Sequence, residues 1–266
     1  MPQDLTPIIE WIEQQLSSRK IVPEVLDKFP GLTEMEAYRV QQATIQRRIA
    51  KGDRPAGMKA AMTSKAMRES VGLKEPVMGH LLQSGMLDES RPVSIAGFVK
   101  ATIEPEVAVI LKVPLQGPGV TRAQALAAIA GYAAAIEIGD IKTGGNKRSP
   151  EQTLICNVMN GGQVAGSKLV APDGIDLRVE GMVVTINGEV RGSATAVEVL
   201  GDPVNSVLFI ANKLGELAKF SNTPLRLEPG WLLMTGSIVR GIPVQAGDHV
   251  EVEFTRLGRV SLRFTV

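Results

Sequence analysis

The chain has 266 residues, and its 29 Lys and Arg nearly balance its 28 Asp and Glu, which leaves a formal net charge of +1. This length allows one large domain, or a small N-terminal unit packed on a larger catalytic one. Because the charges are scattered rather than gathered in a basic block, we expect no nucleic-acid partner. No apolar run approaches the ~20 residues that span a bilayer and no apolar signal segment is apparent, so we expect a cytoplasmic protein without membrane contact.

The cysteine and histidine content limits the kinds of metal site. Cys156 is the only cysteine, and His80 and His249 are the only histidines. One cysteine excludes an intrachain disulfide and a thiolate cluster, and two histidines are too few for a multi-histidine site. Carboxylates would therefore hold any metal, which favours a hard ion such as Mg²⁺ or Mn²⁺.

Apolar residues recur at helical spacing through residues 5–50, with a break at Pro23. Thr33 followed by Glu36 has the pattern of a capping box, in which each side chain bonds the other residue's backbone N–H. A helix should therefore begin after Thr33. We predict an N-terminal helical region over residues 1–54.

The remaining residues, 55–266, form the predicted catalytic domain, in which short apolar runs alternate with glycine and proline. The runs expected to be strands are 99–111, 182–186, 231–235 and 249–254. Helices are expected over the alanine-rich segment 121–135 and over 204–218, a hairpin around Asn187-Gly188, and a turn at 161–166. The pattern predicts an α+β protein.

Glu104 and Glu106 lie two residues apart in an apolar segment, so a strand would point both carboxylates to the same face. Two like charges in such surroundings need a cation or a proton. The alternative is an edge strand with a wet face, which Pro105 favours because it cannot donate a ladder hydrogen bond.

A third carboxylate strengthens the metal hypothesis. Glu137 lies in another apolar segment, where an unpaired charge is costly. Three carboxylates and waters suit Mg²⁺, which keeps positions open for substrate oxygens. Asp140 follows closely; we expect it to act from outside the ligand set, although a ligand or a loop residue is also compatible with its position.

Lys59 is the second candidate, because it lies among apolar neighbours after a glycine. It either extends to solvent or faces the site, where it would neutralise a substrate carboxylate or move a proton. Thr63 and Ser64 either bind substrate or cap a helix that begins at Lys65. Thr235 either lines the mouth of a pocket or belongs to a plain turn at the end of a strand.

These motifs occur in an order that resembles the 2-oxopent-4-enoate hydratase and 4-oxalocrotonate decarboxylase family of the fumarylacetoacetate hydrolase superfamily. The resemblance rests on Gly57-Met58-Lys59, Thr63-Ser64, Ile103-Glu104-Pro105-Glu106, Glu137 with Asp140, and Met234-Thr235-Gly236. It implies a mixed β-roll with an N-terminal helical region. It also implies Glu104, Glu106 and Glu137 as ligands of Mg²⁺ or Mn²⁺ and Lys59 as the active-site lysine.

The resemblance further implies a lyase that acts on a small 2-oxo acid in the meta-cleavage degradation of aromatic compounds. Members form homo-oligomers, and decarboxylases and hydratases of the family associate with one another. Hydratases typically carry an aspartate where this chain has Val77, and Val77 cannot activate water. We therefore favour metal-dependent decarboxylation of 2-oxohex-3-enedioate (4-oxalocrotonate) to 2-hydroxypenta-2,4-dienoate over hydration of the latter to 4-hydroxy-2-oxopentanoate.

Two further alternatives remain. A fumarylacetoacetate-type C–C hydrolase would want a histidine to activate water, which two histidines hardly supply, and a non-catalytic scaffold would gain nothing from a costly carboxylate cluster. The chain also departs from the family pattern at Asp202, which replaces a histidine, and at Cys156-Asn157-Val158-Met159, which replaces Asp-Asn-Ala-Ser. Ile141-Lys142 replaces Ser-Arg. Departures of this kind are compatible with a different substrate, such as a neighbouring dienoate or a longer dioic acid.

Overall fold

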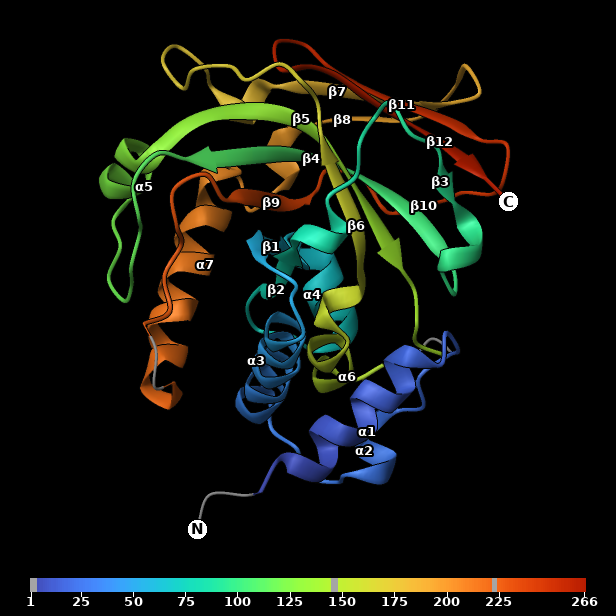
Figure 1. Cartoon of the computed structure of the whole chain (residues 1–266). Coiled ribbons are helices and arrows are strands. Elements are labelled where there is room, and N and C mark those ends of the chain that lie inside the picture. Colours follow the sequence, from blue (N-terminus) through green and yellow to red (C-terminus); the bar gives the residue numbers. More distant parts are fainter. Residues whose placement is uncertain (1–3, 145–147, 222–223) are drawn as a thin grey trace.

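The computed structural model describes residues 4–144, 148–221 and 224–266 (Figure 1). Its α-helices are α1 Thr6–Ser17, α2 Val25–Lys28, α3 Glu34–Ala50, α4 Lys65–Val71, α5 Arg122–Ala128, α6 Pro150–Ile155 and α7 Val204–Leu217. Its strands are β1 Pro55–Ala61, β2 Val77–Leu82, β3 Val93–Ser94, β4 Ala101–Leu111, β5 Ile129–Asp140, β6 Asn160–Ala165, β7 Gly181–Ile186, β8 Glu189–Thr195, β9 Leu232–Ser237, β10 Ile242–Pro243, β11 His249–Phe254 and β12 Gly258–Thr265.

The N-terminal region is helical, as its periodicity predicts. The capping box is present at the start of α3, where Glu36 N donates to Thr33 Oγ1 (3.3 Å) and Thr33 N donates to Glu36 Oε2 (3.0 Å). One buried side chain ties this region to the rest of the protein: Gln41 Nε2 donates to Met78 O in β2 (3.2 Å) and to Leu154 O in α6 (2.8 Å). Gln41 thus links three elements that are distant in sequence.

A seven-stranded mixed sheet runs through the centre in the order β2-β1-β9-β4-β5-β6, and β10 also pairs with β4. β4 has neighbours on both sides, so the edge-strand alternative for the Glu104 segment is wrong. Pro105 lies where β4 changes its partner on that side, from β10 at Thr102 and Ile103 to β9 at Glu106. A residue without an N–H is tolerated at such a change of partner.

A second, five-stranded sheet has the order β3-β12-β11-β7-β8. It lies against the first, because β5 contacts both β11 and β12 (Figure 1). The predicted hairpin joins β7 to β8, and Asn187 and Gly188 both have positive φ (55° and 82°), as a type I′ turn requires. The α+β class and a fold with mixed sheets are therefore observed.

The helix predicted over residues 121–135 is wrong in its second half. Only α5 is helical, and the chain continues as the twelve-residue strand β5. Alanine favours helices, but tertiary contacts override this preference, because β5 pairs with β4 on one side and β6 on the other. Ala133, Ala134 and Ala135 are almost fully buried there, and their small side chains let neighbouring layers approach.

The turn predicted at residues 161–166 is also wrong, because most of this segment is strand β6. Its glycines serve close packing: a Cβ on Gly161 would lie 3.0 Å from Ile138 O and 2.9 Å from the ring of Phe98. Helix α7, by contrast, confirms the prediction over 204–218.

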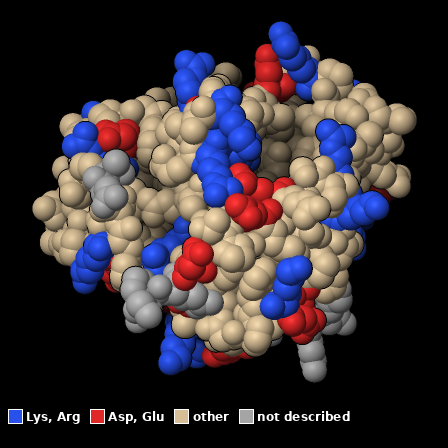
Figure 2. Space-filling model, turned by 60° about the horizontal axis from the view of Figure 1, so that its bottom comes forward, with Lys and Arg blue, Asp and Glu red and all other residues tan. Residues whose placement is uncertain are grey.

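Among the described helices, none combines the length and apolarity needed to cross a membrane. Lys and Arg side chains stand beside Asp and Glu side chains over the face shown in Figure 2, in keeping with charges scattered along the sequence.

Candidate active site

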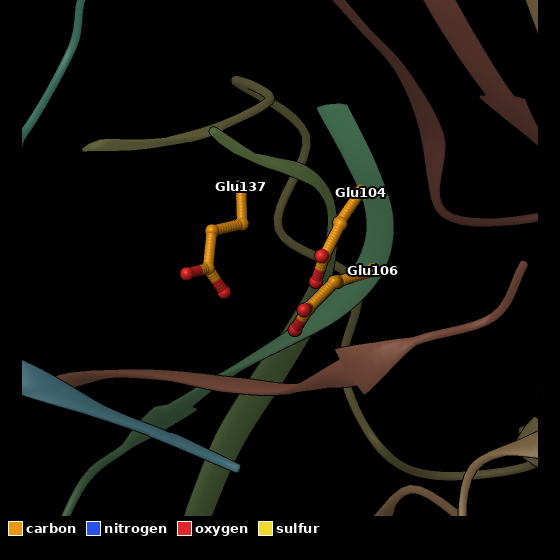
Figure 3. A group of neighbouring side chains, drawn as sticks. All are labelled: Glu104, Glu106 and Glu137. Carbon is orange, nitrogen blue, oxygen red and sulfur yellow. The ribbon is translucent and has the colours of Figure 1, made fainter. Parts of the chain in front are cut away.

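Three glutamates converge at the centre of the large sheet (Figure 3). Glu104 and Glu106 project from one face of β4, and Glu137 lies directly opposite Glu104 in the antiparallel ladder with β5. One carboxylate oxygen of each residue lies within 4.8 Å of those of the other two. The pleat thus brings the pair together as predicted, and the strand register adds the third carboxylate.

Burial makes this cluster costly without a cation. Glu106 and Glu137 have no exposed surface. Burial, and then repulsion from Glu137, raises the pKa of Glu106 well above its usual value, and burial also raises the pKa of Glu104. Within the described part of the chain, Glu106 Oε1 and Glu137 Oε2 are buried without a hydrogen-bond donor. Three clustered carboxylates, two of them with a buried oxygen that lacks a donor, fit a hard divalent ion such as Mg²⁺.

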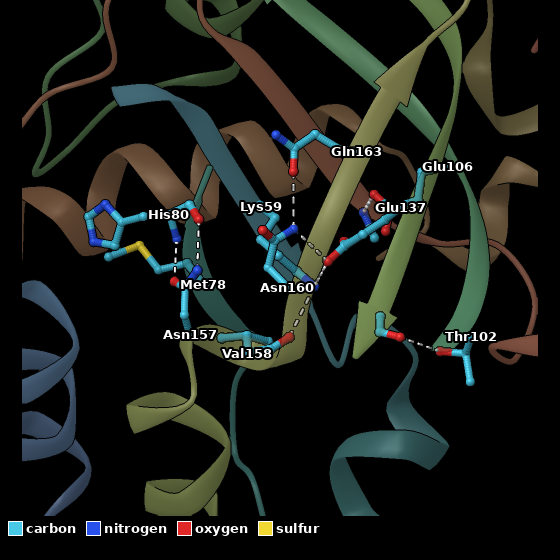
Figure 4. Close-up of polar contacts among 12 residues, drawn as sticks. Lys59, Met78, His80, Thr102, Glu106, Glu137, Asn157, Val158, Asn160 and Gln163 are labelled. Carbon is cyan, nitrogen blue, oxygen red and sulfur yellow. Dashed lines mark hydrogen bonds and ion pairs between the residues drawn. The ribbon is translucent and has the colours of Figure 1, made fainter. Parts of the chain in front are cut away.

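The other carboxylate oxygens have partners that aim the side chains. Gly236 N in β9 donates to Glu106 Oε2 (2.7 Å), and Asn160 Nδ2 in β6 donates to Glu137 Oε1 (3.1 Å). Lys59, at the centre of β1, also donates to Glu137 Oε1 (Figure 4). Five strands of one sheet, β4 and β5 with the glutamates and β1, β6 and β9 with their partners, therefore hold the cluster.

Lys59 is almost fully buried, so the possibility that it extends to solvent is wrong. Its Nζ donates to Glu137 Oε1 and to Val158 O (3.2 Å). Burial alone would lower the pKa of Lys59, but the three nearby carboxylates outweigh it and raise the pKa above its usual value. Lys59 is therefore an ammonium, and one of its three N–H groups is free of protein acceptors among the described residues.

A cavity of about 370 Å³ opens beside this cluster. Its floor includes Lys59 and Glu104, and its described lining contains no aspartate or histidine. The apolar side chains that line it are Ala61, Met62, Ala66, Met67, Ile141, Val158, Met159, Ile238 and Val239. A small acid in this cavity would lie with one end at the carboxylate cluster and the other against apolar groups.

Two arginines in the lining could not be foreseen from the sequence. Arg148 is half-buried, and its positive charge offsets part of the rise that burial causes in the pKa of Glu104, while Arg240 is exposed. Neither guanidinium has a hydrogen bond or an ion pair to another described residue. Arg148 lies in an irregular segment before α6, where no periodicity relates it to the cluster. Both are donors available to an anionic ligand.

The other predicted site residues fall into two groups. Thr63 and Ser64 line the cavity, and Ser64 also caps α4 by accepting from Met67 N (3.2 Å). Asp140, Val77 and Thr235 are not in the described lining. Their predicted roles in catalysis or binding stay predictions.

Each of these three has an evident local environment. Asp140 Oδ1 accepts from Val99 N (2.7 Å) and Lys100 N (3.1 Å), while its Oδ2 pairs with Lys142 (3.1 Å). Thr235 Oγ1 donates to Val107 O (2.8 Å). The side chain of Val77 is buried in the main hydrophobic core. The structure thus gives Asp140 a role in anchoring the loop before β4.

Asp202, one of the departures from the family pattern, also lies outside the cavity. Its Oδ2 pairs with Arg122 (2.6 Å), and its Oδ1 accepts from Val204 N (2.9 Å) at the start of α7. Asp202 therefore stabilises α7 against α5.

Comparison with known proteins agrees with this geometry. A family model described as fumarylacetoacetate (FAA) hydrolase C-terminal matches residues 51–265. Over 254 residues the chain is 30% identical to 2-hydroxyhexa-2,4-dienoate hydratase of Comamonas testosteroni, covering 95% of this chain and 94% of that one. It is also 30% identical over 243 residues to 4-oxalocrotonate decarboxylase of Pseudomonas sp. strain CF600, covering 91% and 90%.

Among solved structures, 4-oxalocrotonate decarboxylase from Pseudomonas putida G7, complexed with magnesium and adipate, superposes with a TM-score of 0.91. The two sequences are 29% identical, and the match covers 98% of each chain. The family model, the relatives and the three-glutamate site agree: the chain belongs to the fumarylacetoacetate hydrolase family.

Proposed function

We propose that this protein is a metal-dependent lyase that decarboxylates 2-oxohex-3-enedioate to 2-hydroxypenta-2,4-dienoate. The observation that carries the choice of reaction is the cavity beside the glutamate cluster, whose described lining is mostly apolar and contains neither aspartate nor histidine. Relatives named 4-oxalocrotonate decarboxylase, and the adipate in one of them, support a six-carbon diacid as substrate.

Glu104, Glu106 and Glu137 would hold the divalent ion, because their carboxylate oxygens cluster and Glu106 and Glu137 each offer a buried oxygen without a donor. A divalent ion here supplies positive charge where negative charge builds up on the substrate during bond cleavage. The net charge of the site would be zero, because the divalent ion and the Lys59 ammonium would balance the three carboxylates. A dianionic substrate therefore requires further cationic side chains. Arg148 lies beside Glu104 and is suited to hold the 1-carboxylate, whereas the exposed Arg240 attracts the dianion toward the cavity.

Breaking the C5–C6 bond releases CO₂ and leaves an electron pair that moves through the conjugated carbons to the 2-oxo oxygen. Protonation of that oxygen gives the 2-hydroxy product. In this proposal the N–H of Lys59 that has no protein acceptor would hydrogen-bond this oxygen as its charge grows and supply the proton.

The apolar lining favours loss of the 6-carboxylate. Met62, Met67 and Val239 offer that carboxylate no hydrogen bond, so it is poorly stabilised, whereas charge spread over the conjugated system tolerates such surroundings better. Hydration would require a group that activates water, and the described lining offers only Glu198, which is exposed, besides Glu104 and Lys59.

A decarboxylation assay tests this function. Purified protein with 2-oxohex-3-enedioate and Mg²⁺ should release CO₂, and a chelator should abolish the release. Absence of CO₂, together with hydration of 2-hydroxypenta-2,4-dienoate, would establish the alternative hydratase activity, which the hydratase relatives favour. Arg148→Gln should raise KM for the diacid at least tenfold; an unchanged KM would remove Arg148 from substrate binding.

The same proposal includes a cytoplasmic homo-oligomer that is able to associate with a pathway hydratase. Light scattering after size-exclusion chromatography tests it, and a single species at the 28.4 kDa of one chain would contradict it.

A further inference from the structure

A strained turn lies directly beside the active-site lysine. Asn157, Val158 and Met159, between α6 and β6, have φ values of 49°, 52° and 59°. Three successive non-glycine residues in the left-handed region are rare, and the branched side chain of Val158 makes this conformation especially unfavourable. Such conformations persist only where surrounding contacts impose them, and they concentrate at functional sites.

The side chain of Asn157 imposes the left-handed conformation of this turn. Its Oδ1 accepts from His80 N and its Nδ2 donates to His80 O, both at 2.8 Å, so it is clamped to the backbone of β2 (Figure 4). Gly79 makes the approach possible, because a Cβ there would lie 3.0 Å from Asn157 O. Met159 N donates to Cys156 O (3.0 Å) and closes the turn.

The clamped turn directs a carbonyl at Lys59. Val158 O accepts from Lys59 Nζ (3.2 Å), opposite the contact with Glu137. Lys59 pairs with Gly79 in the β1–β2 ladder, and a Cβ on Gly79 would come within 3.3 Å of Lys59 Cγ. Gly79 thus leaves room for both the turn and the lysine stem. A right-handed conformation at Val158 would point its carbonyl elsewhere.

We infer that the left-handed turn Asn157–Met159 is a positioning element for Lys59, and that Asn157 is the positioning residue that maintains it. Two acceptors, one on β5 and one on the turn, fix the ammonium so that its third N–H faces the cavity. The same turn contributes the side chains of Val158 and Met159 to the cavity wall. This inference rests on the proposed function only in using turnover as one readout.

The test compares two asparagines. Asn187 matches Asn157 in having positive φ and in accepting from a backbone N–H, that of His249 (2.9 Å), but it lies in the β7–β8 hairpin. Asn157→Ala should lower kcat at least tenfold while KM and the Kd for Mn²⁺ change less than threefold. Asn187→Ala should lower the urea midpoint comparably and leave kcat unchanged.

A second readout is independent of the reaction. The buried ammonium of Lys59 should give a slowly exchanging ¹H–¹⁵N side-chain signal, assigned by its loss in Lys59→Met. That signal should broaden or disappear in Asn157→Ala and persist in Asn187→Ala. Persistence of the signal in Asn157→Ala with unchanged kcat would overturn the inference. Lack of CO₂ release by the wild type would refute only the decarboxylase proposal. The variants would then be compared by their kcat for hydration of 2-hydroxypenta-2,4-dienoate.

Discussion

Glu104 and Glu137 face each other across the ladder between β4 and β5, so two carboxylates form a directly opposed cross-strand pair inside the protein. Like charges in this position repel, and burial strengthens the repulsion. Pairing of the two central strands is therefore opposed by the same groups that would hold a cation, and a bound divalent ion should stabilise the fold.

Glu106→Gln tests this balance. Removing one of the three charges should raise, or leave unchanged, the melting temperature of the metal-free protein, because repulsion within the cluster falls. The variant should lose the Mg²⁺-induced rise in melting temperature and at least 100-fold in kcat, since a ligand and a charge are gone. Calorimetry with and without Mg²⁺ measures this, with the exposed Glu253→Gln as control. An active variant would remove Glu106 from the ligand set.

Lys59→Met should act on both activity and stability. Loss of the donor facing the cavity should lower kcat by about 10² to 10⁴. Loss of the ammonium beside Glu137 should destabilise the metal-free protein by about 3 kcal/mol, and saturating Mg²⁺ should recover much of this. Urea unfolding with and without Mg²⁺ provides the check.

The matched control for Lys59 is Lys213, another buried lysine, which pairs with Glu75 and with Glu216 (2.7 Å) outside the cavity. Lys213→Met should lose stability and keep its kcat. If both variants kept full activity, Lys59 would be structural only.

Val77→Asp should not create a hydratase. Val77 is 1% exposed and lies in the main core, so an aspartate there would be buried without a partner. We expect a loss of about 3 kcal/mol or more in unfolding free energy and no hydration activity. Val190→Asp, at a site that is 67% exposed, should be nearly neutral. Hydration by a stable Val77→Asp protein would show that this position reaches the substrate.

His80 should make the protein less stable in mild acid. Burial lowers the pKa of His80 to about 4, whereas the unfolded chain binds this proton near pH 6.5. Between these values the unfolded state holds more protons, so stability falls as the pH falls from 6.5 toward 4. The slope from one such group is at most about 1.4 kcal/mol per pH unit.

The measurement is the unfolding free energy from urea titrations between pH 4.5 and 7. His80→Gln should flatten the acid side of the stability curve relative to the wild type. Parallel curves for the wild type and His80→Gln would contradict this assignment.

Much of the architecture can be predicted where local chemistry and tertiary context agree. The capping box at Thr33, the Asn187-Gly188 hairpin and strand β11 are examples, because each depends on neighbouring residues alone. Segment 129–135 fails for the opposite reason. Its alanines favour a helix, but strands β4 and β6, contributed by distant parts of the chain, make a strand the lower-energy state.

The candidate site also has a part that the local sequence predicts and a part that only tertiary contacts create. The spacing of Glu104 and Glu106 predicts a shared face, but only the register with β5 brings in Glu137. Arg148 comes from irregular chain, and the clamp of Asn157 on His80 joins residues 77 positions apart. No period in the sequence encodes such contacts.

The hydrogen bonds of the Gln41 amide imply that the N-terminal helical region cannot be removed without loss of the fold. Because it joins α3 to β2 and α6, residues 1–54 complete the support on which the turn at Asn157 rests. Truncation at residue 54 would leave Met78 O and Leu154 O without this donor and would uncover apolar surface beneath both elements. We therefore expect the shortened chain to be unfolded and rapidly cleaved by proteases, so that the N-terminal helices and the sheets behave as a single cooperative unit.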